Sequence, residues 1–476
     1  MDVSPALSTW GPGIAYSRLL RLKSGPDVKL PSLAIECDLC RSWTMESPNT
    51  YTFELRPDAR WQDVGPVYAR PVTAGDVVFS YLRQSDSELP NSPLLHNIYE
   101  LREIDPLTIR ITLDAPDADS LLALADGHSK IVAPEAVEAA GDLRDGPTIG
   151  SGPWALERTA PNDRHEFSPN PYYYEPGLPL LQRLNILILP GKDTRNAAFQ
   201  TGMIDVINMQ PDTWLTYTGR HPDAPFMKAP QPGIGIEVAF KTTEPPFDNV
   251  EVRRAAILGM EPVKAIEEHW GGFGFIGHAF AAESADWLIP QDELARRFDR
   301  RSDAETTLRS SGVAAPVPVV ITVGDFGPSY TAHAHAISVE LQALGFEVET
   351  EIVNRREFGE RIWLGGEYQL MVGPPAPITA PNGYLLPVLH SNGIWNTTGH
   401  RDDVLDELLE SQAVEFDHET RADIIRSIQE RVLDQAYRFM PVAREAIWTW
   451  RSPVRDFHPN FSAYEYHHWA KVWLDG

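Results

Sequence analysis

The sequence is short of positive charge. Lysine and arginine number 41 against 67 aspartates and glutamates, which gives 476 residues a formal net charge of −26. Such a surface repels the phosphate backbone of nucleic acids and the headgroups of anionic lipids. The composition therefore argues against a protein that binds nucleic acid or docks on lipid, and we expect no nucleic acid among its partners.

Long hydrophobic runs are also missing. No stretch approaches eighteen uncharged apolar residues, so the sequence predicts no transmembrane helix. The amino-terminal segment MDVSPALSTWGPG lacks the basic and apolar regions of a secretory signal peptide. Hydrophobic residues still make up 42% of the chain, and its length predicts two or three subdomains.

Cysteine is nearly absent, since Cys37 and Cys40 of the CDLC segment are the two in the chain. A CxxC pair can bind metal or exchange disulfides, but metal sites usually need a second pair or nearby histidines, and none follow. We favour small packed residues or a local disulfide over a redox or zinc centre. We expect no cofactor, and the cysteines do not settle the compartment.

Apolar and polar residues alternate near the start of the chain. Residues 50–63 open with TYTFEL, whose period of two predicts a strand with one buried face. Residues 73–84 predict a helix with Thr73 as its N-cap. Another alternating strand follows a turn within 102–116. Together these segments predict a small α+β subdomain over 33–149.

The rest of the chain changes from apolar strands to alternating strands and helices. Strands are predicted at 184–190 and 233–240, with a helix between them that ends near Gly202. The βαβαβ pattern that follows predicts right-handed crossovers and a largely parallel sheet. Its strands are at 317–324, 346–353 and 368–373, with helices at 332–345 and in REFGERIWLGG. Two longer helices are predicted near 402–416 and 419–437, before an aromatic, strand-like tail.

The stretch VGPPAPITAPNGYL (372–385) carries four prolines and no charge. It leaves the carboxyl end of a strand in an open α/β sheet, where such folds bind their ligands. Prolines reduce the entropy lost when a loop holds one shape over a ligand. An ordinary proline-rich connector is the alternative, and the loop alone favours the connector.

Several segments, in the same order, resemble a known family. They are PSLAIECDLCRSWTMESPNTYTFELRPDARWQD with PVTAGDVVFSYLR, then IGSGPWAL, TEPPFDNVEVRRAAILGM, and the run from GGEYQLMVG to HSNGIWNTTGHRDDVLDELL. Together they cover the chain from about residue 14 to its end. The sequence is similar to the large extracytoplasmic solute-binding proteins of ABC importers, of the oligopeptide- and dipeptide-binding type (solute-binding family 5).

The resemblance implies an α/β, two-lobe periplasmic-binding-protein-like fold with hinged lobes and a small α+β subdomain inserted in the first lobe. The implied parts are lobe I over 1–32, 150–236 and 446–476, the inserted subdomain over 33–149, and lobe II over 237–445. The crossovers between the lobes would be GIGIEVAF and VAREAIWTW.

The resemblance also implies a function. The protein would capture a ligand between its lobes by hinge closure and deliver it to the ABC permease subunits in the membrane, with no bond chemistry. It would be a monomer in an extracytoplasmic, periplasmic or cell-surface location. Family members usually begin with a signal peptide, and for a chain that starts at Met1 without one we favour a trimmed start.

One family feature is missing from the proline-rich loop. Peptide-binding relatives carry an acid there that pairs with the α-ammonium of the peptide, and Pro377 and Ala380 stand at the corresponding positions. A peptide is the family default, but the neutral loop favours blocked peptides, oligosaccharides or another solute without a free ammonium. The candidate ligand-binding residues are Trp10, Pro375, Pro377, Asn382, Tyr384, Trp395 and Asn396.

Tryptophan is abundant, with thirteen residues. Flat rings in a cleft suit sugars or apolar groups, although most tryptophans of a large α/β protein fill its core. For Trp363 we favour the core. For Trp10 and Trp395 the core and the ligand site are equally good interpretations.

Other chemistry has weaker support. Ser151 lies between Gly150 and Gly152 without GxSxG spacing, and WGGFGF lacks the lysine of a phosphate loop, so we expect no catalytic residues. A metal or metal-chelate carrier of the nickel type is the second interpretation and a hydrolase the third. The histidine pairs His333/His335 and His467/His468 do not have chelating spacing by themselves.

Overall fold

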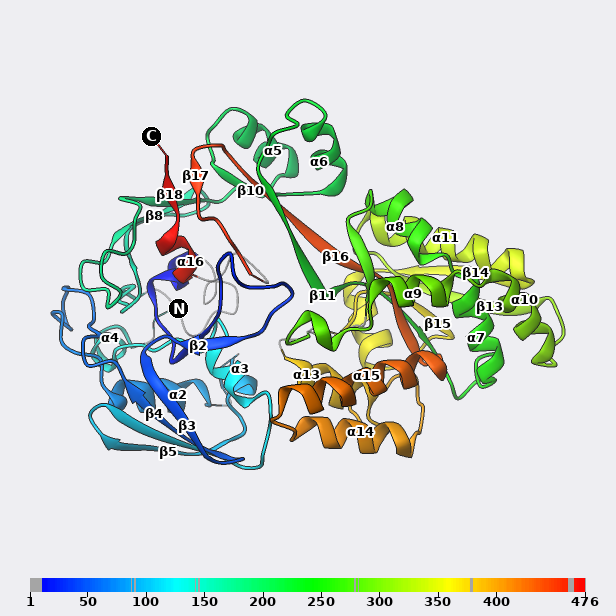
Figure 1. The fold of residues 1–476 in the computed structure, drawn as a ribbon, viewed down its shortest axis with the longest axis horizontal. Coiled ribbons are helices and arrows are strands. Elements are labelled where there is room, and N and C mark those ends of the chain that lie inside the picture. The colour runs from blue at the N-terminus through cyan, green and yellow to red at the C-terminus, as the bar shows by residue number, and fades with distance from the viewer. Residues whose placement is uncertain are drawn as a thin grey trace. The chain divides into compact units, whose positions relative to one another are not determined.

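The computed structural model describes residues 11–86, 88–89, 91–141, 143, 146–277, 280, 282–376, 380–460 and 466–475. The chain divides into two compact units, each described here by itself (Figure 1). Unit 1 comprises Met1–Asn208, Ala224–Met227 and Trp448–Gly476, and unit 2 comprises Met209–Asp223 and Lys228–Ile447. This division is coarser than the organisation implied by the resemblance, which stays a prediction.

Unit 1 contains small antiparallel sheets with short helices around them. Its sheets have the strand orders β1-β2, β3-β4-β6-β5, β7-β8-β9 and β17-β18. The strands are β1 (Leu20–Leu22), β2 (Ile35–Cys37), β3 (Cys40–Ser47), β4 (Thr50–Leu55), β5 (Ile98–Asp105), β6 (Thr108–Leu113), β7 (Trp154–Ala160), β8 (Arg164–Pro169), β9 (Leu184–Leu187), β17 (Val454–Arg455) and β18 (Trp473–Leu474). The helices are α2 (Ala74–Gln84), α3 (Ser120–Ala125), α4 (Pro134–Ala140), α5 (Lys192–Gln200) and α16 (Tyr466–Lys471).

The predicted α+β region lies in the β3-β4-β6-β5 sheet and helix α2. In β4 the alternation places Tyr51, Phe53 and Leu55 in the core. Thr73 precedes α2 as predicted, and its backbone N–H donates to the carboxylate of Asp76 at 2.9 Å. Local sequence patterns therefore determine both elements.

The glycine-rich segment IGSGPWAL, which supported the family resemblance, packs closely against the backbone near Ala15. A Cβ atom on Gly150 would lie only 1.8 Å from the carbonyl oxygen of Ala15. The same oxygen accepts a hydrogen bond from the backbone N–H of Gly152 at 3.0 Å. Glycine stands in this segment because two backbone segments lie in contact there.

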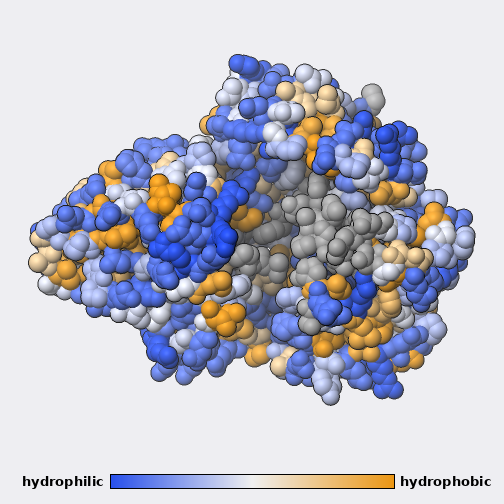
Figure 2. All heavy atoms as spheres, turned by 180° about the vertical axis from the view of Figure 1, so that it is seen from behind, coloured by the Kyte–Doolittle hydropathy of each residue, from blue (hydrophilic) through white to orange (hydrophobic). Residues whose placement is uncertain are grey.

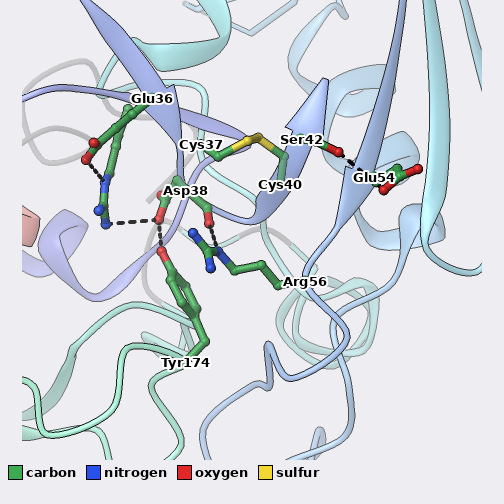
Figure 3. The surroundings of a disulfide bond; sticks show 9 residues. Glu36, Cys37, Asp38, Cys40, Ser42, Glu54, Arg56 and Tyr174 are labelled. Carbon is green, nitrogen blue, oxygen red and sulfur yellow. Dashed lines mark hydrogen bonds and ion pairs between the residues drawn. A yellow bond between two sulfur atoms is a disulfide. The ribbon is translucent and has the colours of Figure 1, made fainter. Parts of the chain in front are cut away.

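Cys37 and Cys40 form a disulfide, so the local-disulfide alternative is confirmed. Figure 3 shows it where β2 gives way to β3, beside Asp38. The Asp38 carboxylate is fully buried and accepts hydrogen bonds from the backbone N–H of Arg18 at 2.7 Å and from the hydroxyl of Tyr174. The disulfide thus closes the turn around Asp38, whose carboxylate is already bound by Arg18 and Tyr174.

Arg21 supplies the counter-charge for this buried carboxylate. Its guanidinium lies 3.8 Å from Asp38 and also pairs with Glu36 at 2.8 Å and Glu175 at 2.7 Å. Burial raises the pKa of Asp38, and the positive charge of Arg21 opposes that rise. The corner is therefore a structural ion-pair network.

Reducing the disulfide is expected to lower the free energy of unfolding of unit 1 by only about 2 kcal/mol, because it closes a very short loop between residues separated by 3 positions. Urea denaturation with and without a reductant measures the difference. A double Cys37→Ser/Cys40→Ser variant should match the reduced protein. Complete unfolding on reduction would contradict this expectation and make the disulfide essential.

Unit 2 is built on a mixed sheet with the strand order β10-β16-β11-β15-β13-β14, in which β10 lies in unit 1 except for Met209, and β12 pairs with β16. The strands are β10 (Val206–Met209), β11 (Phe226–Phe240), β12 (Gly274–Gly277), β13 (Val317–Gly324), β14 (Phe346–Val353), β15 (Leu370–Gly373) and β16 (Arg438–Trp450). The helices are α6 (Pro211–Thr218), α7 (Val250–Gly259), α8 (Pro262–Trp270), α9 (Gln291–Phe298), α10 (Arg301–Ser310), α11 (Pro328–Leu344), α12 (Arg355–Glu357), α13 (Pro381–Tyr384), α14 (Asp403–Ala413) and α15 (His418–Asp434).

The predicted parallel sheet is confirmed in part. β13 pairs in parallel with both β14 and β15, whereas β15 pairs antiparallel with β11. In Figure 1 the long strands β11 and β16 run beside each other, as their pairing requires. The predicted short helix in REFGERIWLGG is α12 followed by a π-helical segment, Phe358–Leu364.

Helices cover the parallel strands in part, whereas Pro318 of β13 and Glu347 and Glu349 of β14 are exposed. On one face, α11 packs Ile337 and Leu341 into a cluster with Val319 and Ile321 of β13. On the other, the π-helical segment Phe358–Leu364 packs against the end of the sheet. This arrangement buries most of β13 and all of β15, whereas β14 stays largely exposed.

The surface agrees with the composition. Figure 2 shows hydrophilic residues over most of the face drawn, with hydrophobic ones in scattered patches. In the described part of the chain, no helix has both the length and the apolar character needed to cross a membrane.

Candidate functional site

The three parallel strands of unit 2 end at one edge of the sheet. β13 ends at Gly324, β14 at Val353 and β15 at Gly373. Because the carboxyl ends of parallel strands meet at the same edge, the segments that follow them gather there. The described residues at this edge include the start of the proline-rich loop.

Aromatic side chains cover this edge. The ring centroid of Phe326 lies 5.7 Å from that of Tyr330, 5.4 Å from that of Phe358 and 6.1 Å from that of Trp363. Phe358 is fully buried, and the other three are half-buried. We call these four residues the edge aromatic cluster.

The strands end in glycine because these rings lie directly on the backbone. A Cβ atom on Gly324 would lie 2.6 Å from the ring of Phe326 and 2.8 Å from that of Phe358. A Cβ atom on Gly373 would lie 2.2 Å from the ring of Phe358. Both glycines thus make room for the edge aromatic cluster.

Hydrogen bonds hold the polar ends of two rings. The hydroxyl of Tyr330 donates to the carbonyl of Gly235 in β11 at 3.1 Å. The indole N–H of Trp363 donates to the carbonyl of Pro374, in the proline-rich loop, at 3.2 Å. The polar atoms of both side chains are thus bound within the scaffold.

Charged groups flank the cluster. The guanidinium of Arg355 lies over the ring of Phe326, 5.4 Å from its centroid. Burial raises the pKa of Tyr330, and the positive charges of Arg444 and Arg355 oppose that rise. Asp325, which is exposed, precedes Phe326 and contributes a carboxylate to the same segment.

One of the predicted ligand-binding residues, Pro375, can be placed at this edge. Trp10 and Pro377 lie outside the described residues. Pro375 is buried two residues after the end of β15. Trp363, which we expected in the core, is half-buried in the edge aromatic cluster.

Asn382 and Asn396 use their amide groups inside the protein. The Asn382 amide donates to the carbonyl of Ala413 at 3.3 Å and accepts from the side chain of Gln412 at 2.7 Å. The Asn396 amide donates to the carbonyls of Ser391 and His400, and its oxygen accepts from the hydroxyl of Thr398 at 2.9 Å. These contacts explain both residues without a ligand.

Tyr384 and Trp395 also belong to the scaffold of unit 2. Tyr384 is 2% exposed, and its hydroxyl donates to the carboxylate of Glu237. Burial raises the pKa of Tyr384 well above its usual range, as does the neighbouring charge of Glu237. Trp395 is half-buried against a hydrophobic cluster that includes Leu389. Ligand contact by any of these residues stays a prediction.

Sequence reasoning did not single out Phe326, Tyr330 and Arg355, which the structure brings together at this edge. A signal for the first two was present, since GDFGPSY directly follows the predicted strand 317–324. The rule that pointed to the proline-rich loop applies equally to this second loop at the same edge. Nothing in the sequence around Arg355 pointed to the edge.

A groove of about 890 Å³ lies at the opposite edge of the sheet. It is lined by the amino-terminal halves of β13 and β14, including Pro318, Val320, Glu347 and Glu349, and by the 245–249 segment. Open α/β sheets bind ligands at the carboxyl ends of their strands, so we place the candidate site at the edge aromatic cluster. Among the described residues, no group of three or more histidine, cysteine, aspartate or glutamate side chains is placed to hold a metal ion.

Known proteins match this chain over nearly its full length. The model of the bacterial extracellular solute-binding proteins, family 5 (Middle), matches residues 34–396. Heme-binding protein A of Haemophilus influenzae is 25% identical over 92% of this chain and 83% of its own. Di/tripeptide-binding protein 3 of Pseudomonas aeruginosa is 22% identical over 93% and 86%.

A solved structure has the same fold. The structure of HbpA2 from Haemophilus parasuis covers 99% of this chain with 96% of its own, at a TM-score of 0.83 and 22% identity. The two-lobe fold class predicted from the sequence is thereby confirmed. The curated relatives are named as binding proteins, which agrees with the expectation that this chain is not an enzyme. The chain belongs to family 5 of the bacterial extracellular solute-binding proteins, the receptors of ABC importers.

Proposed function

We propose that this receptor binds a ligand whose end near the loop after β15 lacks a free α-amino group. The observation that carries the proposal is the uncharged loop after β15. The family resemblance implies that its Pro377 and Ala380 stand where peptide-binding relatives carry acids. A buried ammonium without a carboxylate partner is strongly unfavourable. Backbone carbonyls of such a loop suit neutral hydroxyl or amide groups better than a full positive charge.

The ligand class that fits best is a blocked or modified peptide. One relative is named as a di/tripeptide-binding protein, which supports a peptide. An oligosaccharide also lacks the ammonium and suits aromatic surfaces. If the experiment below finds a bound metal chelate, that ligand class would replace both the peptide and the oligosaccharide.

The working cycle is capture, closure and delivery. β11 and β16 are neighbouring strands, and each contains residues of both units, which suits a two-strand hinge. Closure around the ligand would create the form that the permease subunits recognise. We place the protein outside the cytoplasm, where it acts as a monomer.

Native mass spectrometry of the purified protein identifies any co-purified ligand, and small-angle scattering then tests closure with that ligand. We expect a neutral or blocked organic ligand and a smaller radius of gyration in its presence. An unchanged radius of gyration, with binding confirmed by calorimetry, would contradict hinge closure. A bound metal complex would replace the ligand class.

A further inference from the structure

The groove of about 890 Å³ beside β13 lies where the sheet of unit 2 is incomplete. β13 spans Val317–Gly324, whereas its neighbour β15 spans only Leu370–Gly373 and pairs with residues 321–323. The described strands therefore leave one side of residues 317–320 unpaired, while the other side pairs with β14. Since residues 317–320 and Gln369 line the groove, it occupies this gap, and we call it the amino-edge groove.

The side chain of Gln369 bridges the two walls of the amino-edge groove. Its amide oxygen accepts from the backbone N–H of Val320 at 2.8 Å, and its amide nitrogen donates to the carbonyl of Pro245 at 3.4 Å. A side-chain amide thus makes bonds there that a longer β15 would make with its backbone. Alternate residues of a strand direct their backbone groups to the same side, so the carbonyl of Pro318 also points toward the gap.

The described lining of the groove is rich in hydrogen-bond acceptors and poor in donors. Pro245 and Pro318 have no backbone N–H. The side-chain amide nitrogen of Asn249 already donates to the carbonyl of Ser311 at 3.1 Å, and that of Gln369 donates to Pro245. A chain segment that suits this lining therefore brings donors of its own, and lysine and arginine side chains are donors without acceptors.

Every charged residue in the described lining is acidic. Asp248, Glu347 and Glu349 give it a formal charge of −3, and all three side chains are exposed. In the described part of the chain, no basic group forms an ion pair with Glu347 or Glu349. Asp248 interacts electrostatically with Arg253, which is 4% exposed and lies outside the lining, so the balance stays negative when Arg253 is counted.

Charged residues that adjoin the lining in the chain do not reverse this balance. Lys241 donates to backbone carbonyls and is offset by the exposed Glu244. Arg361 pairs with Glu351 at 3.0 Å and with Glu367 at 3.2 Å, so one cation there meets two carboxylates. The amino-edge groove is therefore complementary in charge to a basic partner.

The pairing of β13 with β14 sets an apolar row beside an acidic row. Pro318 is paired with Glu347, and Val320 is paired with Glu349, so these four side chains share one face of the sheet. Val319 alternates with them and belongs to the hydrophobic cluster on the opposite face. An extended segment in the gap alternates in the same way, with basic side chains on the acidic face and apolar ones on the other.

We infer that the amino-edge groove docks an extended segment of a partner protein in which lysine or arginine alternates with apolar residues. Such a segment adds a short strand beside residues 317–320 and places its cations near Glu347 and Glu349. Only a polypeptide can use the backbone gap, the apolar surface and the carboxylates together, whereas a free polyamine uses the carboxylates alone. The inference goes beyond the proposed function and does not depend on its ligand class.

Calorimetry with short peptides tests the docking site. The probe is Ac-Arg-Val-Arg-Val-Arg-Val amide, and the comparison peptide is Ac-Arg-Arg-Arg-Val-Val-Val amide, which has the same composition without the alternation. Spermidine supplies a cation of similar charge without a peptide backbone. At about 0.15 M salt, which screens attraction to the acidic surface in general, we expect the alternating peptide to bind at least about tenfold tighter than both.

Charge-matched variants assign the binding to the groove. The double variant Glu347→Gln/Glu349→Gln should weaken the alternating peptide about tenfold. The double variant Glu267→Gln/Glu268→Gln removes two exposed carboxylates of α8 and changes the net charge equally, so it should change the affinity less than about twofold. The melting temperature of each variant shows that the fold is retained.

Four outcomes would overturn the inference. Equal affinity for the two peptides, or equal losses in the two double variants, would mean a general attraction between cations and an acidic surface. Spermidine that binds as tightly as the alternating peptide would make the groove a site for small cations. No binding of the alternating peptide would remove the docking site. All four leave the proposed function intact, because ligand capture and closure are measured separately.

Discussion

Replacing Arg438 with methionine is expected to lower the free energy of unfolding of unit 2 by about 3–5 kcal/mol. The Arg438 guanidinium lies 2.9 Å from the carboxylate of Glu237, and the two side chains are 6% and 2% exposed. The hydroxyl of Tyr384 donates to the same carboxylate. Methionine would fill part of the space but leave a buried negative charge without its counter-charge.

Two variants separate this effect from a general loss of packing or of charge. The double variant Glu237→Gln/Arg438→Met removes both charges and should recover most of the lost stability. Arg296→Met breaks the exposed pair with Asp292, whose side chains are 70% and 71% exposed, and should change stability by less than about 0.5 kcal/mol. Urea denaturation measures all three. If Arg438→Met costs no more than Arg296→Met, the buried pair has no special role.

The three groups of this ion-pair network come from three distant segments. Glu237 lies in β11, Arg438 begins β16, and Tyr384 ends α13, within the proline-rich stretch 372–385. Loss of the pair would therefore loosen both long strands and the segment that anchors the loop. We expect ligand affinity to fall together with stability in Arg438→Met and to return in the double variant.

Replacing Gly150 with alanine is expected to destabilise unit 1 by about 3 kcal/mol or more. The new Cβ atom would lie 1.8 Å from the carbonyl oxygen of Ala15, and the obstacle is backbone that no rotamer change can move. Relief requires a shift of one backbone segment, which would stretch the hydrogen bond from Gly152 to the same oxygen. Thermal unfolding followed by circular dichroism measures the loss.

Gly359→Ala is the matched control for this substitution. Nothing lies within 4 Å of a Cβ atom built on Gly359, which sits in a helical segment. Alanine there should be neutral or stabilise by up to about 1 kcal/mol through the unfolded chain. If the Gly150→Ala protein were as stable as the Gly359→Ala protein, the backbone segments at residues 15 and 150 would be able to move apart at no cost in stability.

Local patterns in the sequence determined the elements of the fold. The predicted strand bounds at 317–324 and 346–353 match β13 and β14, and Thr73 precedes α2 as expected. These signals are local because apolar periodicity and capping act within a few residues. The ordered set of family motifs, spread along the chain, gave the two-lobe fold that the comparison with solved structures confirmed.

The assignment of individual side chains was decided by contacts between distant segments. Asn382, Tyr384 and Asn396 read as ligand residues because they are polar or aromatic and lie in or near a loop. In the structure Asn382 bonds to Gln412 of α14, and Tyr384 to Glu237, 147 positions away, while ligand contact by these residues stays a prediction. No local pattern encodes which partner a side chain meets across such a separation.

The sequence by itself therefore determined the class of protein, its secondary structure and the edge of the sheet where a ligand should bind. Only the tertiary structure decided which side chains form that edge. Phe326 follows β13 and Phe358 lies in the segment after β14, and their ring centroids lie 5.4 Å apart because the parallel pairing of the two strands brings both strand ends to one edge. The physical reason is that strand pairing and packing over glycines act at long range, whereas periodicity and capping act locally.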